Sequence, residues 1–220
     1  MLNIVKPDDA FNCEVPCQCC ETVHNCKLIV LTGGPGAGKT AILESARKIL
    51  CQHVAILPEA AGIVFGGGFW RLESPTARLA SQRAIFHIQE EMENLVLGEK
   101  SWGIGLCDRG TLDGLAYWAE SEENFWQTFN TTKDKEYGRY QAVIHLRTPT
   151  LDRGYNHQNP MRVETSDQAA LIDDKIHHVW KNHPNYFEIQ SADSFLEKVD
   201  NAFEIIKKFM PNCCKEHFES

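Results

Sequence analysis

The stretch "KLIVLTGGPGAGKTAILESARKIL", residues 27–50, decides the fold class. It begins with an apolar run that is typical of a buried strand, and it ends with apolar residues at helical spacing. Between the two lie residues 33–40, "GGPGAGKT", which match the pattern G-x-x-x-x-G-K-[ST]. A strand before this pattern and a helix after it are the context in which it forms a phosphate-binding loop. The stretch therefore predicts such a loop at the start of an α/β domain.

Each residue type in this loop has a chemical task. Glycines let backbone N–H groups point inward around a phosphate, and the helix N-terminus adds its positive end. The Lys39 ammonium is expected to reach the β- and γ-phosphates, and the Thr40 hydroxyl is expected to ligate Mg²⁺. The residues expected to bind nucleotide here are Gly33, Gly34, Pro35, Gly36, Ala37, Gly38, Lys39, Thr40 and Ala41. The loop therefore predicts a protein that binds ATP or GTP together with Mg²⁺.

Apolar runs and helical patterns alternate along the rest of the chain. Runs rich in Val, Ile and Leu predict strands at residues 27–32, 53–57, 102–107, 142–146 and 186–189. Apolar stripes predict helices at about residues 42–50, 75–95, 165–179 and 193–210. None of the five runs alternates cleanly with polar residues, as expected for parallel strands that are covered on both faces. The pattern therefore predicts a three-layer α/β domain with a parallel sheet.

The composition is that of an ordinary globular domain. The 220 residues are 43% hydrophobic and 24% charged, and they are enough for one domain with a full core. The net charge of −8 gives no electrostatic reason to expect nucleic acid or an anionic membrane as a partner. An anionic ligand must therefore be held by a local site, against the unfavourable charge of the whole chain.

The two ends of the chain differ from the domain between them. No apolar stretch has the length of a membrane span, and the N-terminus lacks the pattern of a secretion signal, so we expect a cytoplasmic protein. We expect a Cys-rich arm at 1–26, the nucleotide-binding domain at 27–210 and a tail at 211–220. Seven of the nine cysteines lie near the ends: Cys13, Cys17, Cys19, Cys20, Cys26, Cys213 and Cys214. Their odd total argues against a disulfide framework and leaves metal binding, redox activity or inert thiols open.

The acid that closes the third predicted strand indicates the kind of P-loop protein. Asp108 ends the run "WGIGLCD" and is expected to bind Mg²⁺ or a substrate hydroxyl. A motor ATPase would more often carry a second acid next, whereas here Arg109 follows. The base-reading and γ-phosphate-sensing elements of regulatory GTPases are not found at the expected places. These features favour the small-molecule kinase branch, in which Arg109 would neutralise the phosphoryl group during transfer.

A second acid follows the second predicted strand. Glu59 in "LPEAAG" is expected at the same sheet edge as the phosphate loop, because ligands bind at the carboxyl ends of parallel strands. Glu59 is a candidate general base for a substrate hydroxyl, or a residue that positions Mg²⁺ through water. Beyond it, residues 62–71 are interpreted as a glycine-rich loop with Phe69 or Trp70 available to stack on a flat ring, and the Gln82 and Gln89 amides share one helix face.

Residues 147–165 have the composition of a mobile lid, with Pro, Gly and Asn between basic residues. Arg147 is a candidate nucleotide-binding residue, and Arg153 and Arg162 are candidates for contact with the transferred phosphate. The planar guanidinium group donates two hydrogen bonds to phosphate oxygens, which suits all three for this task.

Five motifs in this order resemble the NadR-like P-loop kinase/ATPase family, which is related to nicotinamide-riboside kinase domains and more distantly to deoxynucleoside kinases. They are "LTGGPGAGKT", "LPEAAG", "QRAIFHIQEEME", "CDRGTLDG" and "NPMR…HHVWKNHPNYFEI". The resemblance covers residues 27–209 and implies a parallel sheet in the order 2-3-1-4-5. It implies that Lys39 and Thr40 bind nucleotide and Mg²⁺, that Glu59 and Asp108 lie at the reacting centre, and that Arg109 lies beside the substrate.

The lid departs from the nicotinamide-riboside kinase pattern, because residues 152–154 are Asp-Arg-Gly where those domains carry tandem acids. This difference argues against nicotinamide riboside as the acceptor. The expected function is therefore Mg²⁺-dependent transfer of a γ-phosphoryl group from ATP or GTP to a hydroxyl of a small, nucleoside-like acceptor. Two alternatives remain: a nucleotide switch that acts through a protein or lipid partner, and a metal-organised binding module built on the Cys-rich arm.

Overall fold

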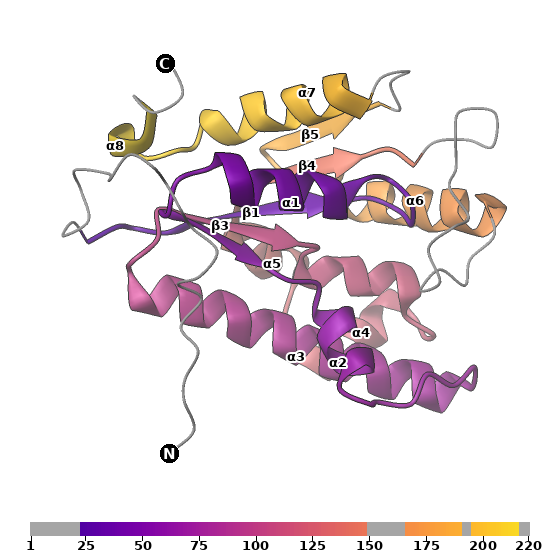
Figure 1. Ribbon diagram of the computed structural model, residues 1–220. Helices are drawn as coiled ribbons and strands as arrows, with labels where there is room; N and C mark the ends of the chain where they lie inside the picture. The colour runs from indigo at the N-terminus through magenta and orange to yellow at the C-terminus, as the bar shows by residue number, and fades with distance from the viewer. Residues whose placement is uncertain (1–22, 149–165, 191–194, 216–220) are drawn as a thin grey trace.

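The computed structural model describes residues 23–148, 166–190 and 195–215. Its centre is a parallel five-stranded sheet in the order β2-β3-β1-β4-β5 (Figure 1). The strands are β1 (Lys27–Thr32), β2 (Val54–Leu57), β3 (Ile104–Asp108), β4 (Tyr140–Leu146) and β5 (Tyr186–Ile189). The predicted three-layer fold and the sheet order that the family resemblance implied are thus confirmed.

Helices cover both faces of the sheet. They are α1 (Lys39–Ile49), α2 (Ala60–Gly66), α3 (Pro75–Glu99), the 3₁₀ helix η2 (Thr111–Tyr117), α4 (Glu122–Phe129), α5 (Lys133–Arg139), α6 (Ser166–Trp180), α7 (Phe195–Lys207) and α8 (Asn212–Lys215). Figure 1 shows α1 and α7 on one side of the sheet and the long α3 on the other. Among the helices of the described residues, none is long and apolar enough to cross a membrane.

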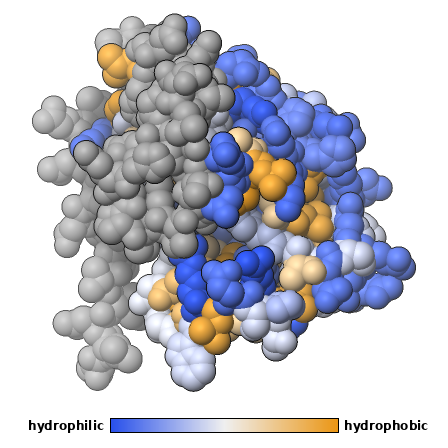
Figure 2. All heavy atoms as spheres, turned by 90° about the vertical axis from the view of Figure 1, so that its right-hand side faces the viewer, coloured by the Kyte–Doolittle hydropathy of each residue, from blue (hydrophilic) through white to orange (hydrophobic). Residues whose placement is uncertain are grey.

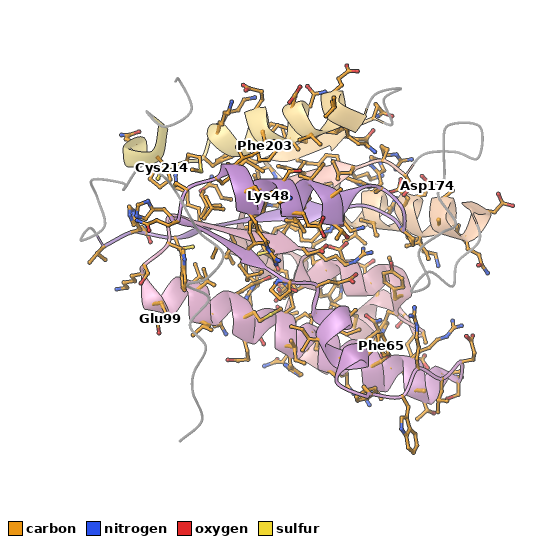
Figure 3. The ribbon with its side chains drawn as sticks, in the orientation of Figure 1. Lys48, Phe65, Glu99, Asp174, Phe203 and Cys214 are labelled. Carbon is orange, nitrogen blue, oxygen red and sulfur yellow. The ribbon has the colours of Figure 1, made fainter. Side chains whose placement is uncertain are left out.

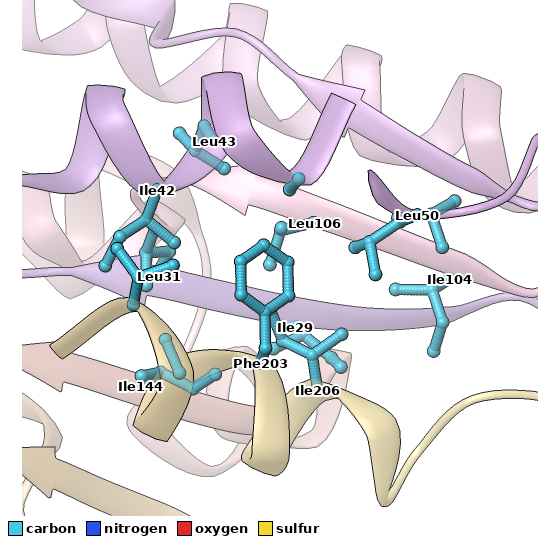
Figure 4. Packing of buried hydrophobic residues seen from close by; sticks show 14 of the residues in the cluster. Ile29, Leu31, Ile42, Leu43, Leu50, Ile104, Leu106, Ile144, Phe203 and Ile206 are labelled. Atoms are coloured by element: carbon cyan, nitrogen blue, oxygen red, sulfur yellow. The ribbon is translucent and has the colours of Figure 1, made fainter. Parts of the chain in front are cut away.

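Strand β1 has apolar side chains on both of its faces, and each face belongs to a different core. Ile29 and Leu31 pack with residues of α1 and α7, as Figure 4 shows. Leu28 and Val30 pack in the opposite core, which contains residues of α3, η2, α4 and α6. These four side chains are at most 1% exposed. Burial on both faces explains why the strand sequence shows no alternation.

Several boundaries differ from those expected from the sequence. Strand β3 begins at Ile104 and includes Asp108, while α7 ends at Lys207 rather than near residue 210, and the short helix α8 follows it. Residues 62–66, expected to lie in a glycine-rich loop, belong to helix α2. Ala60 and Val64, four residues apart on one face of α2, are both buried, and this packing stabilises the helix despite its glycines.

The packing of α7 predicts how two substitutions in this helix should differ. Ile206 is fully buried in the core that α1 and α7 share, whereas Leu196 on the same helix is 72% exposed. We expect Ile206→Ala to lower the free energy of unfolding by about 2–5 kcal/mol, because it removes buried methyl groups and leaves a cavity. Leu196→Ala, the matched control, should change it by less than about 0.5 kcal/mol. Urea unfolding measures both, and equal effects would contradict this packing.

Candidate nucleotide site

The phosphate-binding loop connects the end of β1 to the start of α1. Gly33, Gly36 and Gly38 have φ angles of 140°, 82° and 98°, which L side chains rarely adopt. A Cβ atom at Gly33 would also lie 2.2 Å from the carbonyl oxygen of Leu146. Both the conformation and the close approach therefore require glycine at residue 33.

Lys39 begins α1 and folds back over this loop. Its Nζ donates hydrogen bonds to the carbonyl oxygens of Gly33, at 2.8 Å, and Gly34, at 3.0 Å. Burial and the nearby Arg109 lower the pKa of Lys39 to about 8, although the neighbouring carboxylates act in the opposite direction. The ammonium group thus lies at the phosphate cradle, where the negative charge of a bound ligand would stabilise its protonated form.

Asp108 lies at the end of β3 and lines the same cavity as Thr40. Its Oδ1 atom is buried and has no hydrogen-bond partner among the residues that the structure describes. Burial raises the pKa of Asp108 to about 6, against the influence of Lys39 and Arg109. A buried carboxylate oxygen without a donor fits a hard cation, so Asp108 and Thr40 can hold Mg²⁺ here.

Arg109 connects the ends of three segments that are far apart in the sequence. Its backbone has a φ of 73°, and its side chain is 15% exposed. The guanidinium group donates from Nε to Glu59 Oε1 at 2.8 Å, and from Nη1 to the Gly33 carbonyl oxygen at 3.2 Å and to Asp113 Oδ1 at 3.4 Å. This cation therefore holds the end of β2, the phosphate loop and η2 together.

Glu59 occupies the N-cap position of α2 and is separated from the end of β2 by one residue, Pro58. Burial acts to raise the pKa of this carboxyl, but the Arg109 guanidinium and the Lys39 ammonium outweigh it and lower the pKa. The side chain is 40% exposed and lines the cavity. Glu59 is therefore an ionised hydrogen-bond acceptor beside the phosphate loop.

Asp113 is a buried acid that the sequence analysis did not select. Its Oδ2 accepts from the Gly110 backbone N–H at 2.9 Å and from Trp180 Nε1 at 3.1 Å, and its Oδ1 accepts from the Thr32 hydroxyl. Asp113 thereby joins η2 to β1 and α6 while it neutralises Arg109. The available signal was its place three residues after Gly110 in "DRGTLDG", where an acid can cap a helical turn.

Asp173 is the second acid that the sequence did not reveal. Its Oδ1 accepts from the backbone N–H of Gly34 at 2.8 Å and lies 2.9 Å from His145 Nε2. Arg147 pairs with Asp173 Oδ2 at 3.1 Å and with Asp174 Oδ1 at 2.7 Å. The structure thus places Arg147 in ion pairs with α6, and its expected contact with nucleotide stays a prediction.

One cavity of about 640 Å³ adjoins the phosphate loop and continues between α2, α3 and η2. Its lining brings together seven of the residues that the sequence analysis proposed for the site: Pro35, Gly36, Lys39, Thr40, Glu59, Asp108 and Arg109. Figure 2 looks onto this end of the molecule, where apolar side chains appear between hydrophilic ones. The candidate site is therefore a polar phosphate cradle with a roomy side chamber.

The lining of this chamber includes aromatic rings and amides. Tyr117 and Trp118 line it together with Gln82 and Gln89, and the Nε2 of Gln89 donates to the buried Glu93 at 2.8 Å. Phe69 and Trp70, expected to be available for stacking, are exposed and do not line it. The lid candidates Arg153 and Arg162 lie outside the described residues.

Residues 28–198 match the model of a family described as an AAA domain, and this segment contains all of the site described above. None of the curated proteins matches the chain.

The environment of Lys39 predicts a pH dependence of nucleotide binding. Because its pKa is about 8, the ammonium charge is present at neutral pH and is lost as the pH rises through that value. We expect the affinity for Mg·ATP to fall between about pH 7.5 and 9.5, by at most about tenfold per pH unit. Lys39→Met should bind more weakly and lose this dependence. Titration with a fluorescent ATP analogue measures both, and identical pH profiles would contradict the assignment.

The buried oxygen of Asp108 predicts a dependence on Mg²⁺. Asp108→Asn keeps the size of the side chain and removes its charge, so the Mg²⁺ concentration for half-maximal nucleotide binding should rise at least about tenfold. Binding of nucleotide without Mg²⁺ should persist, because the phosphate loop is unchanged. Asp134→Asn, at an exposed position on α5, is the control and should match the wild type. An unchanged Mg²⁺ requirement in Asp108→Asn would refute the metal role.

Proposed function

Because the chain belongs to the AAA domain family and is a P-loop nucleotide-binding domain, we propose that it is a Mg²⁺-dependent phosphotransferase of the small-molecule kinase type. The donor is ATP or GTP. The acceptor is the hydroxyl group of a small, nucleoside-like molecule.

The continuous cavity is the observation that carries this proposal. The space beside Lys39 and Thr40 extends past Glu59 and Asp108 to the aromatic wall between α3 and η2. A nucleoside triphosphate whose phosphates fill the cradle would leave this chamber for a second molecule. Hydrolysis alone needs room only for a water molecule beside the γ-phosphate, whereas this cavity, cradle and chamber together, has a volume of about 640 Å³ and continues well beyond the cradle.

Each residue of the site has a role in this reaction. Lys39 and the loop N–H groups bind the β- and γ-phosphates, and Thr40 and Asp108 hold the cation. Bound Mg²⁺ would neutralise phosphate charge. Glu59, which stays ionised, orients the acceptor hydroxyl and accepts its proton as the oxygen attacks the γ-phosphorus. The bond to the leaving oxygen breaks as the new P–O bond forms, and the nucleoside diphosphate carries away the electron pair.

Arg109 also favours transfer to a bound acceptor. In the place where a motor ATPase would carry a second acid to orient water, this chain has a guanidinium group that contacts Glu59 and the phosphate loop. Its positive charge is fixed beside the region where the phosphoryl group would pass. Preorganised charge of this kind stabilises a transition state without reorganisation during the reaction.

The wall of the chamber indicates the class of acceptor. Tyr117 and Trp118 offer flat apolar surfaces, and the Gln82 side chain offers both a donor and an acceptor group. A planar ring with polar edges, joined to a part that bears a hydroxyl group, matches this lining. The resemblance to NadR-like kinases also supports a nucleoside-like acceptor.

The proposal predicts the kinetic effect of one substitution. Glu59→Gln keeps the shape of the side chain but removes the proton acceptor, so kcat should fall by roughly 10²-fold or more, while the affinity for nucleotide changes by less than about threefold. Glu44→Gln, at an exposed position on α1, is the matched control and should leave kcat unchanged. The measurement is release of ADP and GDP from Mg·ATP and Mg·GTP, with and without pooled nucleosides, ribosides and small alcohols.

The same assay separates the kinase from a nucleotide switch. Strong stimulation by one acceptor pool supports the kinase, and fractionation of that pool identifies the substrate. Slow release that no pool stimulates, together with tight nucleotide binding and an unaffected Glu59→Gln variant, would contradict the kinase. That result would favour a switch that acts through a protein or lipid partner.

A further inference from the structure

A cluster of metal-ligand side chains lies outside the nucleotide site. Its members are Cys51, which follows α1, His53, which precedes β2, and Cys214 in α8. Their ligand atoms all lie within 4.8 Å of one another, although 161 residues separate His53 from Cys214. All three residues are buried, with at most 4% of their surface exposed. The fold therefore brings two thiols and an imidazole together in a buried site.

The distances within the cluster are close to those of a metal site. His53 Nδ1 lies 3.2 Å from Cys214 Sγ and 3.8 Å from Cys51 Sγ. Tetrahedral zinc holds sulfur at about 2.3 Å and nitrogen at about 2.0–2.1 Å, which places the two kinds of ligand atom about 3.5 Å apart. The same nitrogen faces both sulfur atoms, so one ion between them can contact all three ligands.

The donor set selects the kind of cation. Thiolate and imidazole ligands suit Zn²⁺, whereas Mg²⁺ and Ca²⁺ require oxygen ligands. We propose that Cys51, His53 and Cys214 bind a Zn²⁺ ion that fastens α8 to the segment between α1 and β2. On binding, the two thiols release their protons to solvent, neutral His53 donates its Nδ1 lone pair, and no oxidation or reduction takes place. The fourth tetrahedral position takes water or a further donor.

The surroundings of the cluster favour a structural ion. His24 is buried against His53, with ring centroids 4.6 Å apart, and its backbone N–H donates to the Lys100 carbonyl oxygen at 2.9 Å. The site therefore gathers the segment before β1, the start of β2 and the C-terminal helix. An ion held by Cys51, His53 and Cys214 would fasten two of these parts directly, and the ring contact of His24 would attach the third to His53.

The cluster lies at the opposite end of the sheet from the phosphate loop. His53 immediately precedes β2, whereas the phosphate loop follows the end of the parallel strand β1. Figure 3 shows Cys214 at one end of the molecule and Asp174, which pairs with Arg147 near the nucleotide site, at the other. The proposed ion is thus separate from the Mg²⁺ of the proposed reaction, and its loss should leave nucleotide binding intact.

The first test measures zinc in the full-length protein, purified under reducing conditions in the presence of Zn²⁺ and then dialysed. Elemental analysis should find at least about one Zn²⁺ per chain, and Cys51→Ser and Cys214→Ser should each contain about one Zn²⁺ less than the wild type. Cys26→Ala is the matched control, since Cys26 is a buried cysteine of the other core and does not belong to the cluster. It should retain the wild-type zinc content.

Two further measurements keep the result interpretable. Mg·ATP binding by Cys214→Ser at the wild-type affinity would show that the variant is folded, so that its lower zinc content reflects the lost ligand. A zinc chelator should lower the melting temperature of the wild type by at least about 3 °C and leave that of Cys214→Ser unchanged.

Three outcomes would overturn the proposal. The first is a wild type without zinc, and the second is a Cys214→Ser variant with as much zinc as the wild type, which would place any bound ion elsewhere. The third is a Cys51–Cys214 disulfide, detected by peptide mass analysis, that persists in the wild type under the reducing conditions of purification.

Discussion

The buried charge of Arg109 is the constraint on which the candidate site depends. Three carboxylates, those of Glu59, Asp108 and Asp113, lie around this guanidinium group and would repel one another without it. Because the residue lies directly after β3 with its backbone in the left-handed region, its side chain reaches back toward the Gly33 carbonyl oxygen and sideways toward Glu59 and Asp113. One residue thus fixes the positions of groups from three segments.

The local charge balance also explains how an acidic protein can hold an anionic ligand. The whole chain carries a net charge of −8, but Lys39 and Arg109 place two cations at the phosphate loop. Without ligand, Lys39 interacts with backbone carbonyl oxygens, and its lowered pKa reflects the cost of burying a charge with incomplete compensation. Phosphate oxygens would provide that compensation directly.

Polar contacts from α6 and α7 also hold the phosphate loop. Asp173 accepts from the Gly34 backbone and pairs with Arg147, while Lys198 Nζ donates to the carbonyl oxygens of Ala37, at 3.1 Å, and Arg147, at 2.8 Å. These contacts couple the loop to α6 and α7. A change in the geometry of the loop would therefore alter its contacts with both helices. The same two helices contact Arg147, where the sequence predicted the lid to begin.

The sequence by itself determined the fold class and the phosphate loop, because local patterns specify both. Apolar runs without alternation predicted strands buried on both faces, and Gly33 to Thr40 has spacing that only a tight, glycine-dependent loop explains. Only the tertiary structure showed the roles of Asp113 and Asp173, the ion pair of Arg147 and the cluster of Cys51, His53 and Cys214. The contact of Asp113 with Trp180 spans 67 residues, that of Asp173 with Gly34 spans 139, and that of His53 with Cys214 spans 161. A sequence pattern records neither the side-chain directions nor the packing that brings them together.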